Sequence, residues 1–119
     1  MLIDNNNTVL FLGDSVTDSG RDYFNDQSLG NGFVKMVASW IGVLYPENRI
    51  NFINRGINGS RVDDLLSRYD QDCVTTKPDW ISILIGINDC NKAVTWQDPL
   101  YLSKLEITYR KLLCQIHSC

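Results

Sequence analysis

Three short apolar runs, each ended by a glycine or an asparagine and then a polar cluster, constrain the fold of this chain most strongly. They occupy residues 8–12, 50–53 and 80–86. Apolar residues recur at the spacing of an amphipathic helix over residues 33–44, 62–69 and 102–116. Strands that alternate with helices predict a parallel sheet, because right-handed crossovers return each strand in the same direction. We therefore expect a βαβαβα arrangement of the α/β class, with helices on the faces of the sheet.

The segments between these elements carry their own signals. Residues 14–31 are rich in Gly, Ser, Asp and Asn, so we expect a long irregular loop there, and such loops are usually functional. Ser60 and Asp63 match an S-x-x-D capping pattern, which predicts that Ser60 caps the second helix. Pro99 is typical of a first helical turn and predicts the start of the last helix. Trp96 is expected in the loop after the third strand.

Composition narrows the class of function. The chain has 119 residues, which predicts one domain over residues 1–119 with a single core. The net charge is −3 and no stretch gathers Lys and Arg, which argues against a nucleic-acid partner. Nothing approaches the ~20 apolar residues of a membrane span, and MLIDNNNT lacks the features of an export signal. The four cysteines form no CxxC pair, so we expect reduced thiols in a cytoplasmic protein and no metal site.

Polar residues follow all three predicted strands at the point where each ends. Ser15 follows the first strand, residues 56–59 follow the second, and Asn88 follows the third. The carboxyl ends of parallel strands meet at one edge, where open α/β sheets bind ligands. Ester hydrolysis needs a nucleophile together with hydrogen-bond donors for an anionic oxygen. The Ser15 hydroxyl, the backbone N–H groups of Ser15 and Gly59 and the Asn88 amide supply both, although a lone GDS more often marks an ordinary turn.

These clusters, in this order, resemble the GDSL or SGNH hydrolase family of esterases and lipases. The first block is GDS with Ser15, the second is NRGING with Gly59, and the third is GIND with Asn88; Val16 stands where the family name has leucine. The resemblance implies a flavodoxin-like three-layer α/β/α domain in which Ser15 is the nucleophile. It also implies that Ser15, Gly59 and Asn88 form the oxyanion hole and that no cofactor is needed. The motifs are most similar to those of bacterial enzymes that remove acetyl groups from sugars or xylo-oligosaccharides.

One family block is missing from this sequence. The resemblance implies a DxxH near the C-terminus whose histidine activates the serine, and the single histidine, His117, lies in CQIH instead. His117 ends the last predicted helix, about 27 Å from its start at 1.5 Å per residue, so we expect it at the opposite edge of the sheet from Ser15. We therefore expect the N-terminal three fifths of such an enzyme. An uncovered sheet edge beside the third strand would then favour self-association.

Several residues keep two interpretations. Asp14 could bind substrate or form an Asx turn, and Trp96 could line a sugar pocket or lie on the surface. Arg21 and Arg55 could contact a polar substrate or face solvent. Cys90 is a weak candidate for a second nucleophile. We expect Asp89 to be structural, and Trp40 and Trp80 to lie in the core.

Three alternatives to an O-acetyl esterase stay open. The chain could be a catalytically inactive remnant that lacks the His-Asp pair, or a lysophospholipase or thioesterase that acts on other acyl esters. The strand order alone also suggests a phosphate or nucleotide binder of flavodoxin type. The absence of a GxGxxG or GxxxxGK[ST] loop after the first strand weakens that interpretation.

Overall fold

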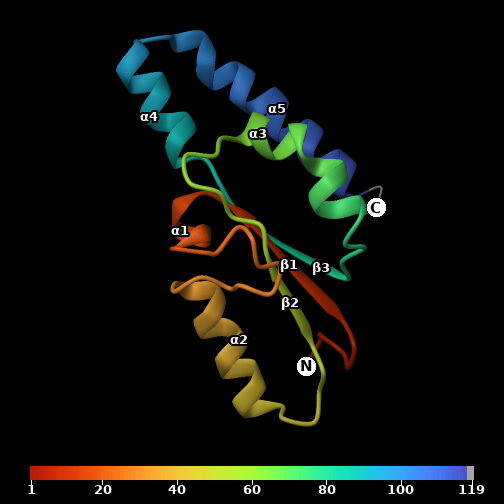
Figure 1. Ribbon diagram of the computed structural model, residues 1–119. Helices are drawn as coiled ribbons and strands as arrows, with labels where there is room; N and C mark the ends of the chain where they lie inside the picture. The colour runs from red at the N-terminus through yellow and green to blue at the C-terminus, as the bar shows by residue number, and fades with distance from the viewer. Residues whose placement is uncertain (118–119) are drawn as a thin grey trace.

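The core of the molecule is a parallel sheet of three strands with β1 in the middle. The computed structural model describes residues 1–117. The strands are β1 (Thr8–Gly13), β2 (Asn51–Asn54) and β3 (Trp80–Leu84). Both neighbours run parallel to β1, in the order β2-β1-β3 (Figure 1). The parallel α/β sheet predicted from the sequence is confirmed, and the carboxyl ends of its strands share one edge.

A helical segment follows each strand. Within the described residues these segments are α1 (Ser15–Asp18), α2 (Phe33–Leu44), α3 (Val62–Ser67), the π-helical turn η1 (Asp70–Val74), α4 (Ile87–Trp96) and α5 (Pro99–His117). The predicted helical patterns correspond to α2, to α3 and to α5, whereas η1 lies beyond the predicted range of residues 62–69 and was not expected. The expectation of irregular structure over residues 14–31 is wrong at its beginning, where α1 forms.

The side chains of β1 alternate between two apolar layers, as a doubly covered sheet requires. Val9 and Phe11 pack with α2 on one face, and Leu10 and Leu12 pack with α3 and α5 on the other. All four are at least 95% buried, and each such side chain stabilises the fold by about 1.5–3 kcal/mol. Figure 1 shows α2 on one side of the sheet, with α3 and α5 on the other. The three-layer α/β/α arrangement is thus confirmed.

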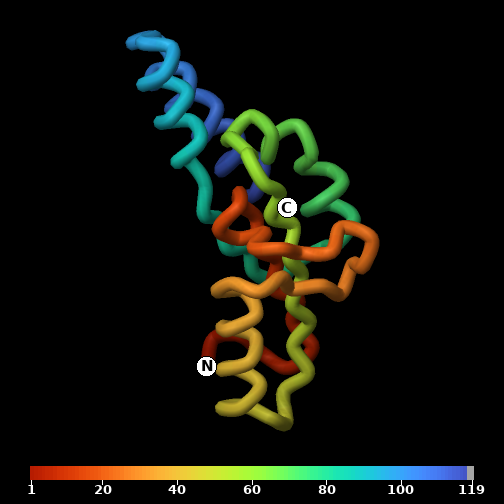
Figure 2. Tube along the Cα trace, turned by 60° about the vertical axis from the view of Figure 1, so that its left-hand side comes forward, coloured from red at the N-terminus to blue at the C-terminus, as the bar shows by residue number. Residues whose placement is uncertain are grey.

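Helix α4 is an element that the sequence pattern does not reveal. Trp96 is its last residue, so the loop position expected for Trp96 is wrong. In the segment INDCNKAVTW the buried residue is Asp89, whereas Ile87, Val94 and Trp96 are exposed, so its apolar residues form no buried stripe. The Lys92 ammonium lies 4.4 Å from the centre of the Trp96 ring and 5.3 Å from that of Tyr101, which joins α4 to α5. Figures 1 and 2 both show α4 and α5 as a hairpin that extends beyond the sheet.

The start of α3 differs by one residue from the predicted cap. Arg61 is the N-cap, and its backbone N–H donates to Asp64 Oδ2 at 2.8 Å, so the acid of the cap is Asp64 rather than Asp63. The Ser60 hydroxyl accepts a hydrogen bond from Arg68 instead. The S-x-x-D pattern therefore located the helix correctly but assigned the wrong capping residues.

Part of the apolar surface remains exposed. Trp40 is 64% exposed and Trp80 41% exposed, so the core positions expected for both are wrong. β3 is an edge strand, since β1 is its one partner among residues 1–117. Self-association through that edge stays a prediction. No helix within the described residues is both long and apolar enough to cross a membrane.

Candidate active site

Ser15 lies at the carboxyl end of β1 and is exposed. It is the first residue of α1, and the buried Asp14 caps that helix by accepting a hydrogen bond from the Val16 backbone N–H at 3.0 Å. Gly13 makes the turn possible, because a Cβ there would lie 2.2 Å from Thr17 Oγ1 and 2.7 Å from the Leu84 carbonyl oxygen. The sequence thus places an exposed serine at the carboxyl edge of the sheet. The substrate contact expected of Asp14 stays a prediction.

Gly59 lies in the loop after β2, in a backbone conformation that favours glycine. Its φ is +78°, and an added Cβ would meet no atom within 4 Å. The left-handed conformation therefore calls for glycine, and a side chain would point into open space. The Ile57 backbone N–H donates to the Gly13 carbonyl at 3.2 Å, which attaches this loop to the end of β1.

Asn88 and Asp89 occupy the first turn of α4, after β3. The Asn88 Nδ2 donates to the Ser60 carbonyl at 3.0 Å. The buried Asp89 carboxylate accepts from the Val62 backbone N–H and from the Tyr101 hydroxyl, both at 3.1 Å. These bonds attach the segment after β3 to the residues that follow Gly59. The structural role expected for Asp89 matches these contacts.

The three segments predicted to carry the site are thus joined to one another by hydrogen bonds. Ile57 bonds to the end of β1, and Asn88 bonds to the residue after Gly59. The Asn88 amide group carries a second N–H besides the one that Ser60 accepts. A hydroxyl, a backbone N–H and a carboxamide on adjoining segments can serve acyl transfer chemically. That the three groups meet at a single oxygen atom stays a prediction.

Asn54 is a central residue of the site that sequence reasoning missed. Its side chain is fully buried, and Nδ2 donates to the Thr17 and Leu29 carbonyls at 2.8 and 2.9 Å. Its Oδ1 accepts from the Gly56 backbone N–H at 2.8 Å. One amide therefore connects α1, the loop before α2 and the loop that carries Gly59. Its only sequence signal is its place at the end of the second apolar run.

Asp18 organises a second polar cluster that the sequence pattern did not indicate. It is buried, and its carboxylate accepts from the Arg21 backbone N–H, the Tyr23 hydroxyl and the Asn58 backbone N–H. The hydrogen bond to Asp18 raises the pKa of Tyr23, which stays protonated and donating at neutral pH. Arg21 donates from Nε and Nη2 to the Gly56 carbonyl at 3.0 and 2.8 Å. Burial lowers the pKa of Arg21, and Asp18 opposes that shift.

The remaining candidates lie apart from these contacts. Trp96 follows Asn88 by eight residues of helix, about 12 Å along its axis, and its role in sugar binding stays a prediction. Arg55 is half-buried and lies 3.9 Å from the exposed carboxylate of Asp26. Cys90 is exposed. Nothing in the described structure gives either residue a catalytic partner.

His117 is in the last turn of α5, far from the candidate site along the strands. Two residues before it, the Gln115 carbonyl accepts from the Tyr69 hydroxyl at 2.8 Å. Gln115 also lines a groove with Pro78, which precedes β3. His117 therefore lies near the beginning of the strands, whereas Ser15 follows the end of β1.

Comparison with known proteins identifies the lineage. The profile of the GDSL-like lipase/acylhydrolase family matches residues 11–119. An acetylxylan esterase from Geobacillus stearothermophilus is 37% identical over 123 residues, which cover 97% of this chain and 56% of the esterase. The chain thus spans a little over half the length of this relative.

Solved structures of the same Geobacillus stearothermophilus esterase superpose closely. A catalytic mutant with a serine replaced by alanine gives a TM-score of 0.90 at 36% identity, over 99% of this chain and 57% of that one. A catalytic mutant with a histidine replaced gives the same TM-score, identity and coverage. With residues 11–119 matched by the family profile, the chain belongs to the GDSL-like lipase/acylhydrolase family.

Proposed function

We propose that this chain carries the nucleophile and the oxyanion donors of a serine ester hydrolase that acts on small O-acyl esters, in particular O-acetyl groups of carbohydrates. Ser15 is the nucleophile in this proposal. The backbone N–H groups of Ser15 and Gly59 and the Asn88 amide are the donors. The observation that carries it is the hydrogen bond from Asn88 Nδ2 to the Ser60 carbonyl, which fastens two donor segments together.

The relatives support the ester class. The protein that matches 97% of this chain is an acetylxylan esterase, and its catalytic mutants include replacements of a serine and of a histidine. Ser15 lies in the GDS motif of this chain and is exposed just after the end of β1, which makes it the candidate for the corresponding serine. The substrate belongs to the proposal, because the chain covers 56% of that esterase.

The chemistry follows from the groups named. Ser15 Oγ attacks the acyl carbon as its proton passes to a base, and the carbonyl oxygen becomes anionic. Collapse of this intermediate expels the alcohol, which takes up a proton and leaves an acyl-serine that water hydrolyses to the acid. Each well-aimed donor to the anionic oxygen is worth about 2.7–4 kcal/mol in the transition state. A base must come within about 3 Å of the serine proton, and His117 lies at the far end of the strands.

An added base provides a direct test of the proposal. Acetate release from an acetylated xylobiose should be measured with and without imidazole, which can accept the serine proton from solution. We expect imidazole to increase acetate release by the wild-type chain, and Ser15→Ala to abolish the increase. Ser39→Ala is the matched control, because Ser39 is exposed on α2 and its hydroxyl bonds to the Lys35 carbonyl within the helix.

The alternatives give different results in the same assay. A chain that binds sugar esters without turnover would show no difference between wild type and Ser15→Ala at any imidazole concentration. With a lysophospholipid or an acyl thioester in place of the acetylated xylobiose, a lysophospholipase or thioesterase would release fatty acid or thiol faster than it releases acetate from the sugar ester. Either result would contradict the proposed O-acetyl specificity, and the first would also remove Ser15 from the mechanism.

A further inference from the structure

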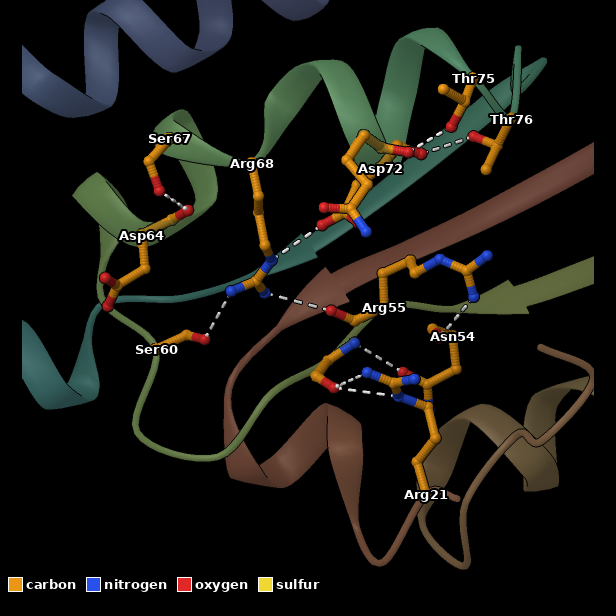
Figure 3. A network of polar contacts seen from close by, with 12 residues as sticks. Arg21, Asn54, Arg55, Ser60, Asp64, Ser67, Arg68, Asp72, Thr75 and Thr76 are labelled. Carbon is orange, nitrogen blue, oxygen red and sulfur yellow. Dashed lines mark hydrogen bonds and ion pairs between the residues drawn. The ribbon is translucent and has the colours of Figure 1, made fainter. Parts of the chain in front are cut away.

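One side chain, Arg68, holds both ends of the segment that carries Gly59. Arg68 is the C-cap of α3. Its Nη1 donates to Ser60 Oγ at 3.0 Å and its Nη2 donates to the Arg55 carbonyl at 3.1 Å. Figure 3 shows the guanidinium between these two acceptors, with Asp72 on its other side. The guanidinium therefore spans the loop from residue 55 to residue 60.

The anchor of this guanidinium is a buried carboxylate. Arg68 Nε donates to Asp72 Oδ2 at 2.8 Å, and the side chains are 17% and 7% exposed. Burial raises the pKa of Asp72, and Arg68 opposes that shift. A guanidinium presents its donors in a rigid plane, which a lysine ammonium cannot reproduce. The pair thus fixes the loop by geometry as well as by charge.

Ser60 connects Arg68 to both candidate donors, the Gly59 N–H and the Asn88 amide. Its hydroxyl is held by Arg68 and its carbonyl by the Asn88 amide, while Gly59 is its neighbour in the chain. We propose that Arg68, anchored by Asp72, is a positioning residue that sets the direction of the Gly59 N–H and of the Asn88 amide. The catalytic part of this inference rests on the proposed function. The restraint on the loop does not depend on it.

A second arginine supplies a matched control. Arg110 on α5 also pairs with an acid four residues away, Glu106, at 3.0 Å. Their side chains are 75% and 67% exposed, and both partners lie on one helix. Exposed ion pairs of this kind contribute little to the stability of the fold. Arg110→Lys therefore repeats the chemical change of Arg68→Lys where no loop is held.

The first measurement is the backbone order of Gly59, by relaxation of glycine-selective ¹⁵N labels. We expect an order parameter of about 0.85 in the wild-type chain and below about 0.6 in Arg68→Lys. Ser60→Ala, which removes one acceptor and keeps the Arg68–Asp72 pair, should lower it in the same direction. Gly42 on α2 should not change in any variant, and Arg110→Lys should leave both glycines unchanged. Unchanged order at Gly59 in the folded Arg68 or Ser60 variants would overturn the inference.

The second measurement is acetate release supported by imidazole. In Arg68→Lys we expect kcat to fall about tenfold or more, as misplaced catalytic groups do, with KM unchanged. Arg110→Lys should stay within about twofold of wild type. If the wild type shows release that depends on Ser15, and Arg68→Lys lowers the order parameter of Gly59 without lowering kcat, the positioning role is wrong. If Gly59 loosens but the wild type shows no release that depends on Ser15, the restraint stands and the proposed function fails. Should Arg68→Lys not fold, Ser60→Ala decides both measurements.

Discussion

Asn54→Ala tests how strongly a single buried amide holds the candidate site together. Asn54 is fully buried and makes three hydrogen bonds, to the Thr17 and Leu29 carbonyls and from the Gly56 N–H. The substitution leaves the Gly56 N–H and the Thr17 carbonyl buried without their partner. A buried polar group left unsatisfied costs about 1–3 kcal/mol, and the Leu29 carbonyl and the cavity add to this. We therefore expect the free energy of unfolding to fall by about 3–5 kcal/mol.

Urea unfolding followed by circular dichroism measures this loss. The midpoint should fall with an unchanged m value, which indicates a change in stability rather than in the unfolded state. Asn51→Ala is the control on the same strand, because Asn51 is exposed and its amide contacts Thr8 Oγ1 only at 3.5 Å. That change should stay within about 0.5 kcal/mol. A loss of less than about 1 kcal/mol in Asn54→Ala would refute the central role given to these bonds.

Two further predictions concern stability elsewhere in the fold. Gly42→Ala should stabilise the chain by about 0.5–1 kcal/mol, because Gly42 lies within α2 and an added Cβ meets no atom within 4 Å; a lower midpoint in urea would be inconsistent with this helix. Burial raises the pKa of Asp72 above its ordinary value of 3.8, so the fold binds that proton more tightly than the unfolded chain. The contribution of Asp72 to stability should therefore be greatest below that ordinary value and decline as the pH rises through the raised pKa. Asp72→Asn should remove this decline, and an unchanged pH dependence of unfolding would contradict it.

Much of the architecture could be predicted because it depends on local patterns. The runs that became β1 and β3 are apolar and end at glycines, and α2 and α5 repeat apolar residues at helical spacing. Trp40 does not belong to the stripe that includes Val34 and Ile41, and its 64% exposure follows from that position. The spacing on α2 predicted the helix but not the burial of each side chain, since Leu44 follows the same spacing and is 60% exposed.

The parts that were missed depend on contacts between distant segments. α1 has four residues, too few for any periodicity. Asp14 caps it, and it packs closely against Gly30 and Gly56 in neighbouring loops. α4 has Gly86 as its N-cap, without a side-chain cap, and its buried residue is the polar Asp89. The burial of Asn54 and Asp18 arises only when the loops after β1 and β2 come together. The sequence motif was enough to predict Ser15, but not Asn54 and Asp18, whose hydrogen bonds join the loops around it.

The central claim is that Ser15, Gly59 and Asn88 surround one anionic oxygen. The most direct measurement is a crystal structure of the chain after prolonged reaction with a fluorophosphonate, whose phosphonyl oxygen occupies the place of the oxyanion. We predict an adduct on Ser15 with that oxygen about 3 Å from the Gly59 nitrogen and from Asn88 Nδ2. An adduct on another residue, or an oxygen more than about 4 Å from both donors, would contradict the claim.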